Sequence, residues 1–270
     1  MTDEQPTASR PGDFTGEWNP ALIRRLITLG RPLYKLWFRF EVRGLENVPD
    51  GGSMIVSNHS GGPNPQDVPI LWLDFFEKFG YDRPLYTLGH DLLFQGPITR
   101  VLMQLGMIRA TRDNAVKALR SGVVIVFPGG DNDALRPTWQ QSKIDFSGRT
   151  GYVTTAIESG VPIVPTVSIG GQETQLFLTG GTRLAEWIGL KRVTRSARVV
   201  LSIGIPFGLS VGAINLPLPS KIVTQVLKPV DITAEFGENP DIVEVDAHVR
   251  KVMQSALDEL AAQRRFPIIG

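Results

Sequence analysis

Short apolar stretches typical of β-strands alternate along the chain with stretches typical of helices, and this order is the strongest constraint on the fold. The strand-like stretches are rich in β-branched residues and are bounded by glycine, proline or asparagine: SMIVSN, PLYTLGH, GMIRA, GVVIVFP, VPIVPTVSI and ARVVLSIGI. Helical spacing marks the segments VPILWLDFFEKF, LFQGPITRVLMQL, NAVKALRS, GYVTTAIES and TRLAEWIGL. The alternation predicts an α/β fold with a largely parallel central sheet flanked by helices, in which ligands bind at the carboxyl ends of the strands.

The two ends of the chain differ from this central pattern. Residues 1–19 are rich in Thr, Pro, Gly and acidic residues, which predicts a flexible tail. The last long segment, DIVEVDAHVRKVMQSALDELAAQRR, predicts an amphipathic helix. We therefore expect three parts: a tail over 1–19, a helical segment over 20–41 and one main domain over 42–270.

The composition excludes several kinds of site. The chain has 270 residues, a formal net charge of +1 and no cysteine, so a thiol nucleophile and thiolate metal ligands are excluded and a nucleic-acid partner is not indicated. The chain has three histidines, His59, His90 and His248. They are too few to suggest a His-rich zinc site, so we expect no metal. The polar N-terminus does not resemble a signal peptide, which predicts a cytoplasmic chain.

The segment over 20–41 is a basic amphipathic helical segment with five basic residues and no acid between Pro20 and Phe40. Gly30-Arg31-Pro32 predicts a division into two helices. One apolar stripe runs along it at helical spacing: Leu22, Leu26, Leu29, Leu33, Leu36, Trp37 and Phe40. The stripe is compatible with packing on the core and with lying among the headgroups of anionic lipids, peripherally on the inner face of the cell membrane.

A second apolar stretch, the uncharged one between Arg198 and Lys221, has about the length that crosses a bilayer, roughly 20 residues. Three prolines and three glycines interrupt it. We therefore expect a strand and a loop there, and no membrane span.

The loop VSNHSGGPNPQD leaves the first buried strand at its carboxyl end and carries the residues of the candidate site. An imidazole ordinarily has a pKa that suits a general base near neutral pH, so His59 is a candidate for that role, and a carboxylate such as that of Asp67 would fix its tautomer. The N–H groups of Ser60, Gly61 and Gly62 are candidates for holding an oxyanion. A histidine that only stabilises the loop remains the alternative.

Four stretches in order resemble the four sequence blocks of the glycerolipid acyltransferase superfamily, which includes the lysophosphatidate acyltransferases: NHSGGPNPQD, GMIRATRDN, FPGGDNDALRP and VPIVPTVSIG. The resemblance runs from about Val42 to Val230. It implies an acyltransferase domain in which His59 takes the proton from an acceptor hydroxyl and Asp67 stabilises the imidazolium. It also implies acyl-CoA or acyl-ACP as co-substrate, with no tightly bound cofactor.

Two blocks depart from the family pattern. In the first, the usual place of the aspartate is Asn64, and seven residues separate His59 from Asp67. We assign the orienting role to Asp67, which begins the next predicted helix. In the third, Phe-Pro-Gly-Gly-Asp-Asn replaces the usual Phe-Pro-Glu-Gly-Thr-Arg, and this form is more similar to the mono- and diacylglycerol acyltransferase branch.

Basic side chains near these blocks are candidates for binding the phosphates of a nucleotide thioester or a lipid headgroup. They are Arg109, Arg112, Arg136, Lys143 and Arg149, with Arg109 and Arg149 favoured by their position. For each, a solvated surface residue is the alternative.

Other polar and flexible positions are assigned by their place in the chain. Gly129 and Gly130 follow an apolar strand, which predicts that they line the site. Asp133 either replaces the missing acid of the third block or caps the next turn. We expect His90 to be a hydrogen-bonded structural residue and His248 to lie on the surface.

The favoured interpretation is an O-acyltransferase that moves a long-chain acyl group from a thioester to a glycerolipid hydroxyl, with a lysophospholipid or lysophosphatidate as first acceptor. A mono- or diacylglycerol acceptor is the alternative within the superfamily. From other classes, a hydrolase with Ser60 as nucleophile lacks a Gly-x-Ser-x-Gly elbow. A lipid-binding protein with a degenerate site remains open.

Overall fold

The central element is a mixed, mostly parallel β-sheet. The computed structural model describes residues 10–62, 65–178, 201–211, 215–264 and 266. Within these residues, seven strands form the sheet in the order β1–β10–β6–β2–β5–β3–β4. Their bounds are Glu41–Arg43 (β1), Ser53–Ser57 (β2), Leu85–Gly89 (β3), Met107–Arg109 (β4), Val123–Val126 (β5), Ile163–Ile169 (β6) and Val223–Val226 (β10). Strands β2 to β6 are parallel and β10 is antiparallel to β6, which confirms the predicted α/β fold.

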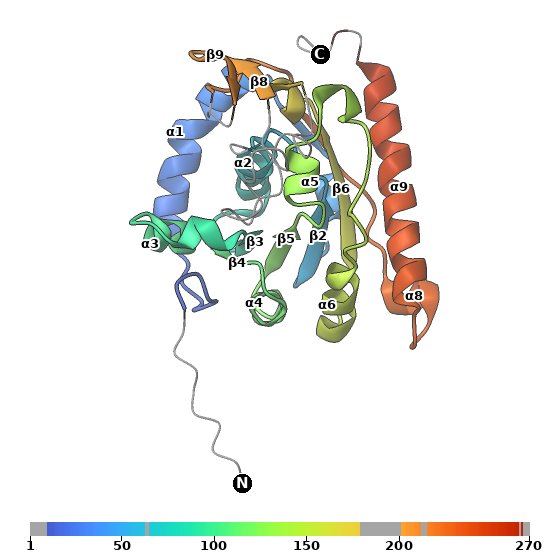
Figure 1. Cartoon of the computed structure of the whole chain (residues 1–270). Coiled ribbons are helices and arrows are strands. Elements are labelled where there is room, and N and C mark those ends of the chain that lie inside the picture. The colour runs from blue at the N-terminus through green and yellow to red at the C-terminus, as the bar shows by residue number, and fades with distance from the viewer. Residues whose placement is uncertain (1–9, 63–64, 179–200, 212–214, 265, 267–270) are drawn as a thin grey trace.

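Helices cover both faces of this sheet (Figure 1). The α-helices are α1 (Pro20–Phe38), α2 (Asp67–Phe79), α3 (Thr99–Gln104), α4 (Arg112–Leu119), α5 (Asp131–Ala134), α6 (Gly151–Ser159), α8 (Ile232–Phe236) and α9 (Ile242–Gln263). The 3-10 helices are η1 (Leu45–Asn47), η2 (Asp91–Phe94), η3 (Thr138–Gln140) and η4 (Gly171–Glu173). Because side chains alternate along a strand, Ile55 packs with α1 and α2 while Met54 and Val56 pack with α4, α6 and α9.

Helix α1 is continuous through Pro32, so the prediction of two helices was wrong. Asn19 caps its first turn by accepting a hydrogen bond from the N–H of Leu22. A proline inside a helix removes one backbone hydrogen bond. Here the residue before it is held from outside, because the Arg31 guanidinium lies 3.0 Å from a carboxylate oxygen of Asp74 on α2.

The face of α1 that packs on the core is not the predicted apolar stripe. Ile23, Ile27 and Phe38, which lie outside the stripe, are buried, and Phe40 just after the helix is a stripe residue that is buried as well. Most of the stripe faces outward, with exposed side chains at Leu26, Leu29, Leu33, Leu36 and Trp37. Helix α1 therefore packs on the core, as one interpretation expected, but it does so mainly through residues outside the predicted stripe, and most of that stripe faces outward.

The sequence predicts a flexible tail over residues 1–19, but residues 10–18 are packed against the domain. The Phe14 ring lies 5.2 Å from the Tyr86 ring, and its N–H donates to the side chain of Asn114. The Trp18 indole donates to the carbonyl of Tyr81. These two aromatic residues anchor an otherwise polar segment by burying apolar surface. Residues 1–9 lie outside the described part.

A second, three-stranded antiparallel sheet holds the strand expected from ARVVLSIGI. It consists of β7 (Leu176–Phe177), β8 (Leu201–Gly204) and β9 (Gly208–Val211), in that order. Its placement outside the parallel sheet corrects the prediction, and residues 197–200 and the helix expected from TRLAEWIGL lie outside the described residues. The helices that the structure describes include none long and apolar enough to cross a membrane.

Candidate active site

His59 lies just beyond the carboxyl end of β2 and is paired with Asp67 at the start of α2. The Nδ1 atom of His59 is 3.1 Å from Oδ2 of Asp67. The same oxygen accepts the N–H of Ser60 at 2.8 Å, and Oδ1 accepts the N–H of Val68 at 2.9 Å. These bonds fix the carboxylate, so the ring nitrogen that faces it is Nδ1 and Nε2 is the atom that can take a proton. Asn64, the alternative partner, lies outside the described residues.

The His59 ring is largely enclosed, with 17% of its side chain exposed. It lies over Phe127, the residue that follows β5, with ring centroids 4.3 Å apart. Burial by itself lowers the pKa of His59, but the Asp67 carboxylate, with Asp133 and Asp131, outweighs it and raises the pKa above its ordinary value. Residues from two neighbouring strands thus meet where β2 and β5 end.

Asp133 is a second buried carboxyl group beside His59. Its Oδ2 accepts the backbone N–H of His59 at 3.4 Å, and its Oδ1 is paired with the guanidinium of Arg136. Burial raises the pKa of Asp133 to about 6, against the opposing effect of Arg136. Asp133 therefore supports the loop of His59 through the backbone N–H of that residue.

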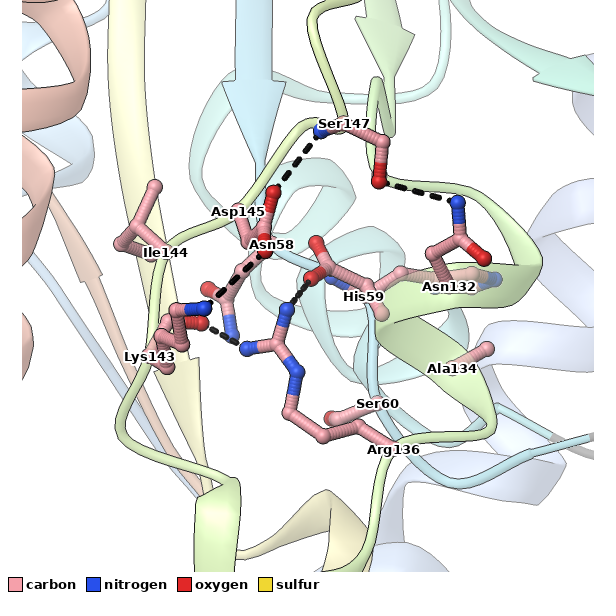
Figure 2. Close-up of polar contacts among 12 residues, drawn as sticks. Asn58, His59, Ser60, Asn132, Ala134, Arg136, Lys143, Ile144, Asp145 and Ser147 are labelled. Atoms are coloured by element: carbon pink, nitrogen blue, oxygen red, sulfur yellow. Dashed lines mark hydrogen bonds and ion pairs between the residues drawn. The ribbon is translucent and has the colours of Figure 1, made fainter. Parts of the chain in front are cut away.

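Arg136 joins two loops next to His59, as Figure 2 shows. Besides Asp133, its guanidinium bonds to the carbonyl oxygen of Lys143. The neighbouring segment is tied back in the same way, because Asn132 donates to the hydroxyl of Ser147 at 2.9 Å. Arg136 is 7% exposed, so it acts as a structural cation and does not present its charge to a substrate.

Gly129 and Gly130 form the turn after β5, against Asp133 and Arg149. A Cβ at Gly129 would collide with the Asp133 carboxylate, so the close approach of these residues requires glycine. Gly130 has a positive φ of 51°. Arg149 donates from Nη1 to the carbonyl oxygens of Pro128 and Gly129 and keeps an exposed side chain. The predicted cation Arg149 therefore lies at this turn, close to the end of β5.

The three backbone N–H groups proposed as oxyanion donors all have acceptors within the protein. Ser60 donates to Asp67, Gly61 to the side chain of Gln172 at 3.4 Å and Gly62 to the carbonyl of Ala134 at 2.9 Å. These bonds shape the loop, so an oxyanion would have to displace one of them. The Ser60 hydroxyl is buried against Gly171 and has no hydrogen-bond partner among the described residues. His59 therefore does not contact this hydroxyl as a base that activates a nucleophile would.

Two further cations predicted for substrate binding lie elsewhere. Arg109 forms ion pairs with Asp13 at 3.2 Å and Asp91 at 3.1 Å, and it is largely buried. Arg112 bonds to Glu158 at the end of α6, on the exposed surface. Their predicted role in substrate binding is therefore not supported, since intramolecular carboxylates already occupy both guanidinium groups.

The remaining predicted residues have surface or structural positions. Lys143 is exposed and pairs with Asp145. His90 caps η2 by accepting the N–H of Leu92, the structural role expected of it. His248 lies on the outer face of α9, 3.7 Å from Glu235, as predicted. In the part of the chain that the structure describes, no group of three or more His, Asp and Glu residues could hold a metal ion.

Sequence reasoning missed two amides that hold the site together. Asn58 forms two hydrogen bonds of 2.8 Å with the backbone of Ser168 in β6, which fixes the end of β2. Gln172 donates to the carbonyls of Asp133 and Ala134 at 2.7 and 3.1 Å. Both are polar residues just past the carboxyl end of a predicted parallel strand, and that position is the signal that could have found them.

Comparisons with known proteins identify the family of this chain. A family model described as Acyltransferase matches residues 39–169. An uncharacterized protein of Mycobacterium tuberculosis is 30% identical over 264 residues, which cover 95% of this chain and 70% of that protein. The chain belongs to the acyltransferase family.

Two more relatives carry descriptive names. A mouse DGAT1/2-independent enzyme synthesizing storage lipids is 30% identical over 155 residues, covering 57% of this chain and 45% of that protein. The crystal structure of the 1-acyl-sn-glycerophosphate acyltransferase of Thermotoga maritima matches with a TM-score of 0.56 and 18% identity, over 89% of this chain and 81% of that one. This last similarity shows a shared fold.

Proposed function

We propose that the protein transfers a long-chain acyl group from acyl-CoA or acyl-ACP to a hydroxyl of a glycerolipid. The observation that carries the proposal is the 3.1 Å pairing of His59 with Asp67 at the carboxyl ends of β2 and β5. An imidazole held by a carboxylate at Nδ1 can act as a general base through Nε2. Family membership supports the same reaction class.

In the proposed reaction, Nε2 of His59 takes the proton from the acceptor hydroxyl as its oxygen attacks the thioester carbonyl. The new C–O bond forms, the C–S bond breaks, and the proton passes from the imidazolium to the departing thiolate. Asp67 stabilises the imidazolium, because a nearby carboxylate favours the charged ring. General base action accounts for roughly 10² to 10⁴ in rate, and positioning of the two substrates supplies much of the rest.

Two acceptor classes are candidates. A lysophospholipid or lysophosphatidate would need cations for its phosphate, and Arg149 at the Gly129–Gly130 turn is the described candidate. A mono- or diacylglycerol is favoured by the ion pairs that occupy Arg109 and Arg136 and by the mouse relative whose name refers to storage lipids. A lysophospholipid carries a phosphate and an acylglycerol does not. The two classes therefore differ in whether the site needs a cation near His59 that is not already paired within the protein.

We also propose that the exposed face of α1 rests on an anionic lipid surface, which would bring the site to its substrates. Leu33 is 68% and Leu36 80% exposed, and basic residues lie along the same helix. Apolar and basic residues on one exposed helix are typical of helices that bind membrane surfaces.

The decisive experiment monitors thiol release from a long-chain acyl thioester with four acceptors offered in turn: lysophosphatidate, another lysophospholipid, monoacylglycerol and diacylglycerol. Acylated product is identified by mass spectrometry, and a reaction without acceptor measures hydrolysis. Release that depends on an acceptor supports transfer and identifies the acceptor class. Equal release without any acceptor would indicate a hydrolase, and no release with any of them would leave a lipid-binding role.

A further inference from the structure

The sheet β7–β8–β9 exposes an unusual amount of apolar side chain for such a small element. Its described residues 201–211, together with the following segment 215–220, contain no charged residue. The exposed large side chains, 39 to 64% exposed, are Ile203, Ile205, Phe207, Leu209 and Leu216. A contiguous apolar patch on a folded protein marks a surface that contacts another apolar phase or partner.

This apolar patch continues directly into the exposed stripe of α1. The Trp37 indole donates to the carbonyl of Pro217 at 2.9 Å, and the Arg39 guanidinium donates to the carbonyl of Pro219 at 3.0 Å. Leu216 in turn bridges to Ile205. In Figure 1 the orange strands β8 and β9 lie at the end of the blue helix α1, in agreement with the hydrogen bonds of Trp37 and Arg39.

The distribution of charge identifies the partner. No acid lies between Pro20 and Phe40, and the exposed basic residues of α1 and of its C-cap are Arg24, Arg25, Lys35 and Arg39. The sheet adds exposed apolar side chains and no charged residue. Cations beside exposed aliphatic and aromatic residues match the anionic headgroups and acyl chains of a bilayer, whereas a protein partner would need complementary acids.

We infer that the β8–β9 sheet is a second membrane-contacting element, which inserts Ile205, Phe207 and Leu209 into the same anionic bilayer surface on which α1 rests. This inference rests on the lipid surface proposed above for α1. It adds a second point of contact, and two points fix the orientation of the domain on the bilayer where one helix alone would leave it free to rotate.

The same sheet also reaches the candidate active site. Phe177 of β7 is buried against Gly62, where a Cβ would collide with its ring. Its backbone N–H donates to the hydroxyl oxygen of Thr138 at 2.9 Å. β7 pairs with β8 through Leu176 and Phe177. Only β7 therefore lies between β8 and the loop of His59, which places the site beside the lipid from which an acceptor would come.

The chain has no cysteine, so single cysteines can be introduced for labelling. Phe207→Cys carries an environment-sensitive nitrobenzoxadiazole probe, and Val243→Cys, an exposed position on α9, is the matched control. With vesicles of phosphatidylcholine and phosphatidylglycerol, the inference predicts a blue shift and increased emission at position 207 and no change at 243. Unchanged emission at 207 while the protein sediments with the vesicles would overturn it.

A second measurement compares binding strength. Ile205→Ser with Phe207→Ser should weaken co-sedimentation by about tenfold or more, because less apolar surface is removed from water, whereas Val243→Ser should not. A thermal unfolding midpoint equal to that of the unchanged protein verifies the fold. Equal vesicle binding of a folded double variant would contradict the inference, as would lipid-free dimers that the double variant abolishes.

These measurements use protein and vesicles without an acyl donor. Failure of the proposed function, seen as absent thiol release with every acceptor, would therefore leave the binding result readable. The membrane inference would fail on its own if the protein were active but the probe at position 207 kept the emission of a group in water when vesicles are added.

Discussion

The loop of His59 and the face formed by α1 and the β8–β9 sheet depart from the usual distribution of side chains in opposite ways. Around His59, carboxylates and amides are buried, and each is held by hydrogen bonds: Asp67, Asp133, Gln172 and Asn58. On the other face, large apolar residues are exposed. Buried polar groups need hydrogen-bond partners and are therefore held rigidly, which suits chemistry. Exposed apolar groups lower the free energy only when another apolar phase covers them, which suits docking.

The substitution His59→Ala tests the chemical role of the buried polar region and has the largest expected effect. Removal of the general base should lower the rate of acyl transfer by roughly 10² to 10⁴, with little change in the thermal unfolding midpoint. Thiol release and product formation measure the effect. His248→Ala, on the exposed face of α9, is the matched control and should retain full turnover. Full turnover in His59→Ala would move the chemistry away from this edge of the sheet.

Arg136→Met tests whether the buried polar groups form one supporting network. The substitution leaves the Asp133 carboxylate buried without its cation, which should lower the free energy of unfolding by about 3 to 5 kcal/mol. Urea denaturation measures the change. Adding Asp133→Asn to the variant should restore part of the loss, since no unpaired charge then remains. Independent, additive effects of the two substitutions would contradict a coupled pair.

Asp67→Asn sharpens the role of the carboxylate beside His59. We expect turnover to fall by roughly two orders of magnitude while substrate binding changes little. Because Asp67 raises the pKa of His59, its loss should lower that pKa, so the neutral base would persist to lower pH and the acidic limb of kcat/KM would move to lower pH.

The shift is measured by recording the pH profile of kcat/KM for the unchanged protein and for Asp67→Asn. An acidic limb that stays in place or moves to higher pH would contradict the assigned pairing. Asn64→Ala provides the comparison, because an effect there and none at Asp67 would transfer the orienting role to Asn64.

The smallest expected effect concerns the charges of α1. Arg25→Gln with Lys35→Gln should weaken binding to anionic vesicles by about 1 kcal/mol per charge at low ionic strength, and by less in high salt. Co-sedimentation at two salt concentrations measures both values. Lys251→Gln on α9 is the control for a general charge effect. Equal losses for neutral and anionic vesicles would mean that the charges do not select the lipid.

Patterns within a few residues were enough for much of the fold and for the centre of the site. The strands β2 to β6, the helices α2, α6 and α9, and the position of His59 at a strand end all follow from the local spacing of apolar, β-branched and turn residues. The pairing of His59 with Asp67 spans only eight positions. It was accessible because the aspartate begins the helix that follows the loop.

Long-range contacts account for the predictions that differ. Arg109 was expected to bind substrate, but Asp13 lies 96 positions away in sequence and next to it in space. Pro32 does not divide α1, and Arg31 next to it is paired with Asp74 of another helix, 43 positions away in sequence. β10 escaped prediction because it has only four residues and gains its stability from β6 and β1.

Local sequence patterns predicted the class of fold, the edge of the sheet where the candidate site lies and the histidine proposed as base, since these depend on local periodicity and on strand ends. Only the tertiary structure decided which cations are occupied, which face of α1 is exposed and where the β8–β9 sheet lies. The physical reason is that a charge or an apolar surface is defined by what covers it, and the covering groups come from distant parts of the chain.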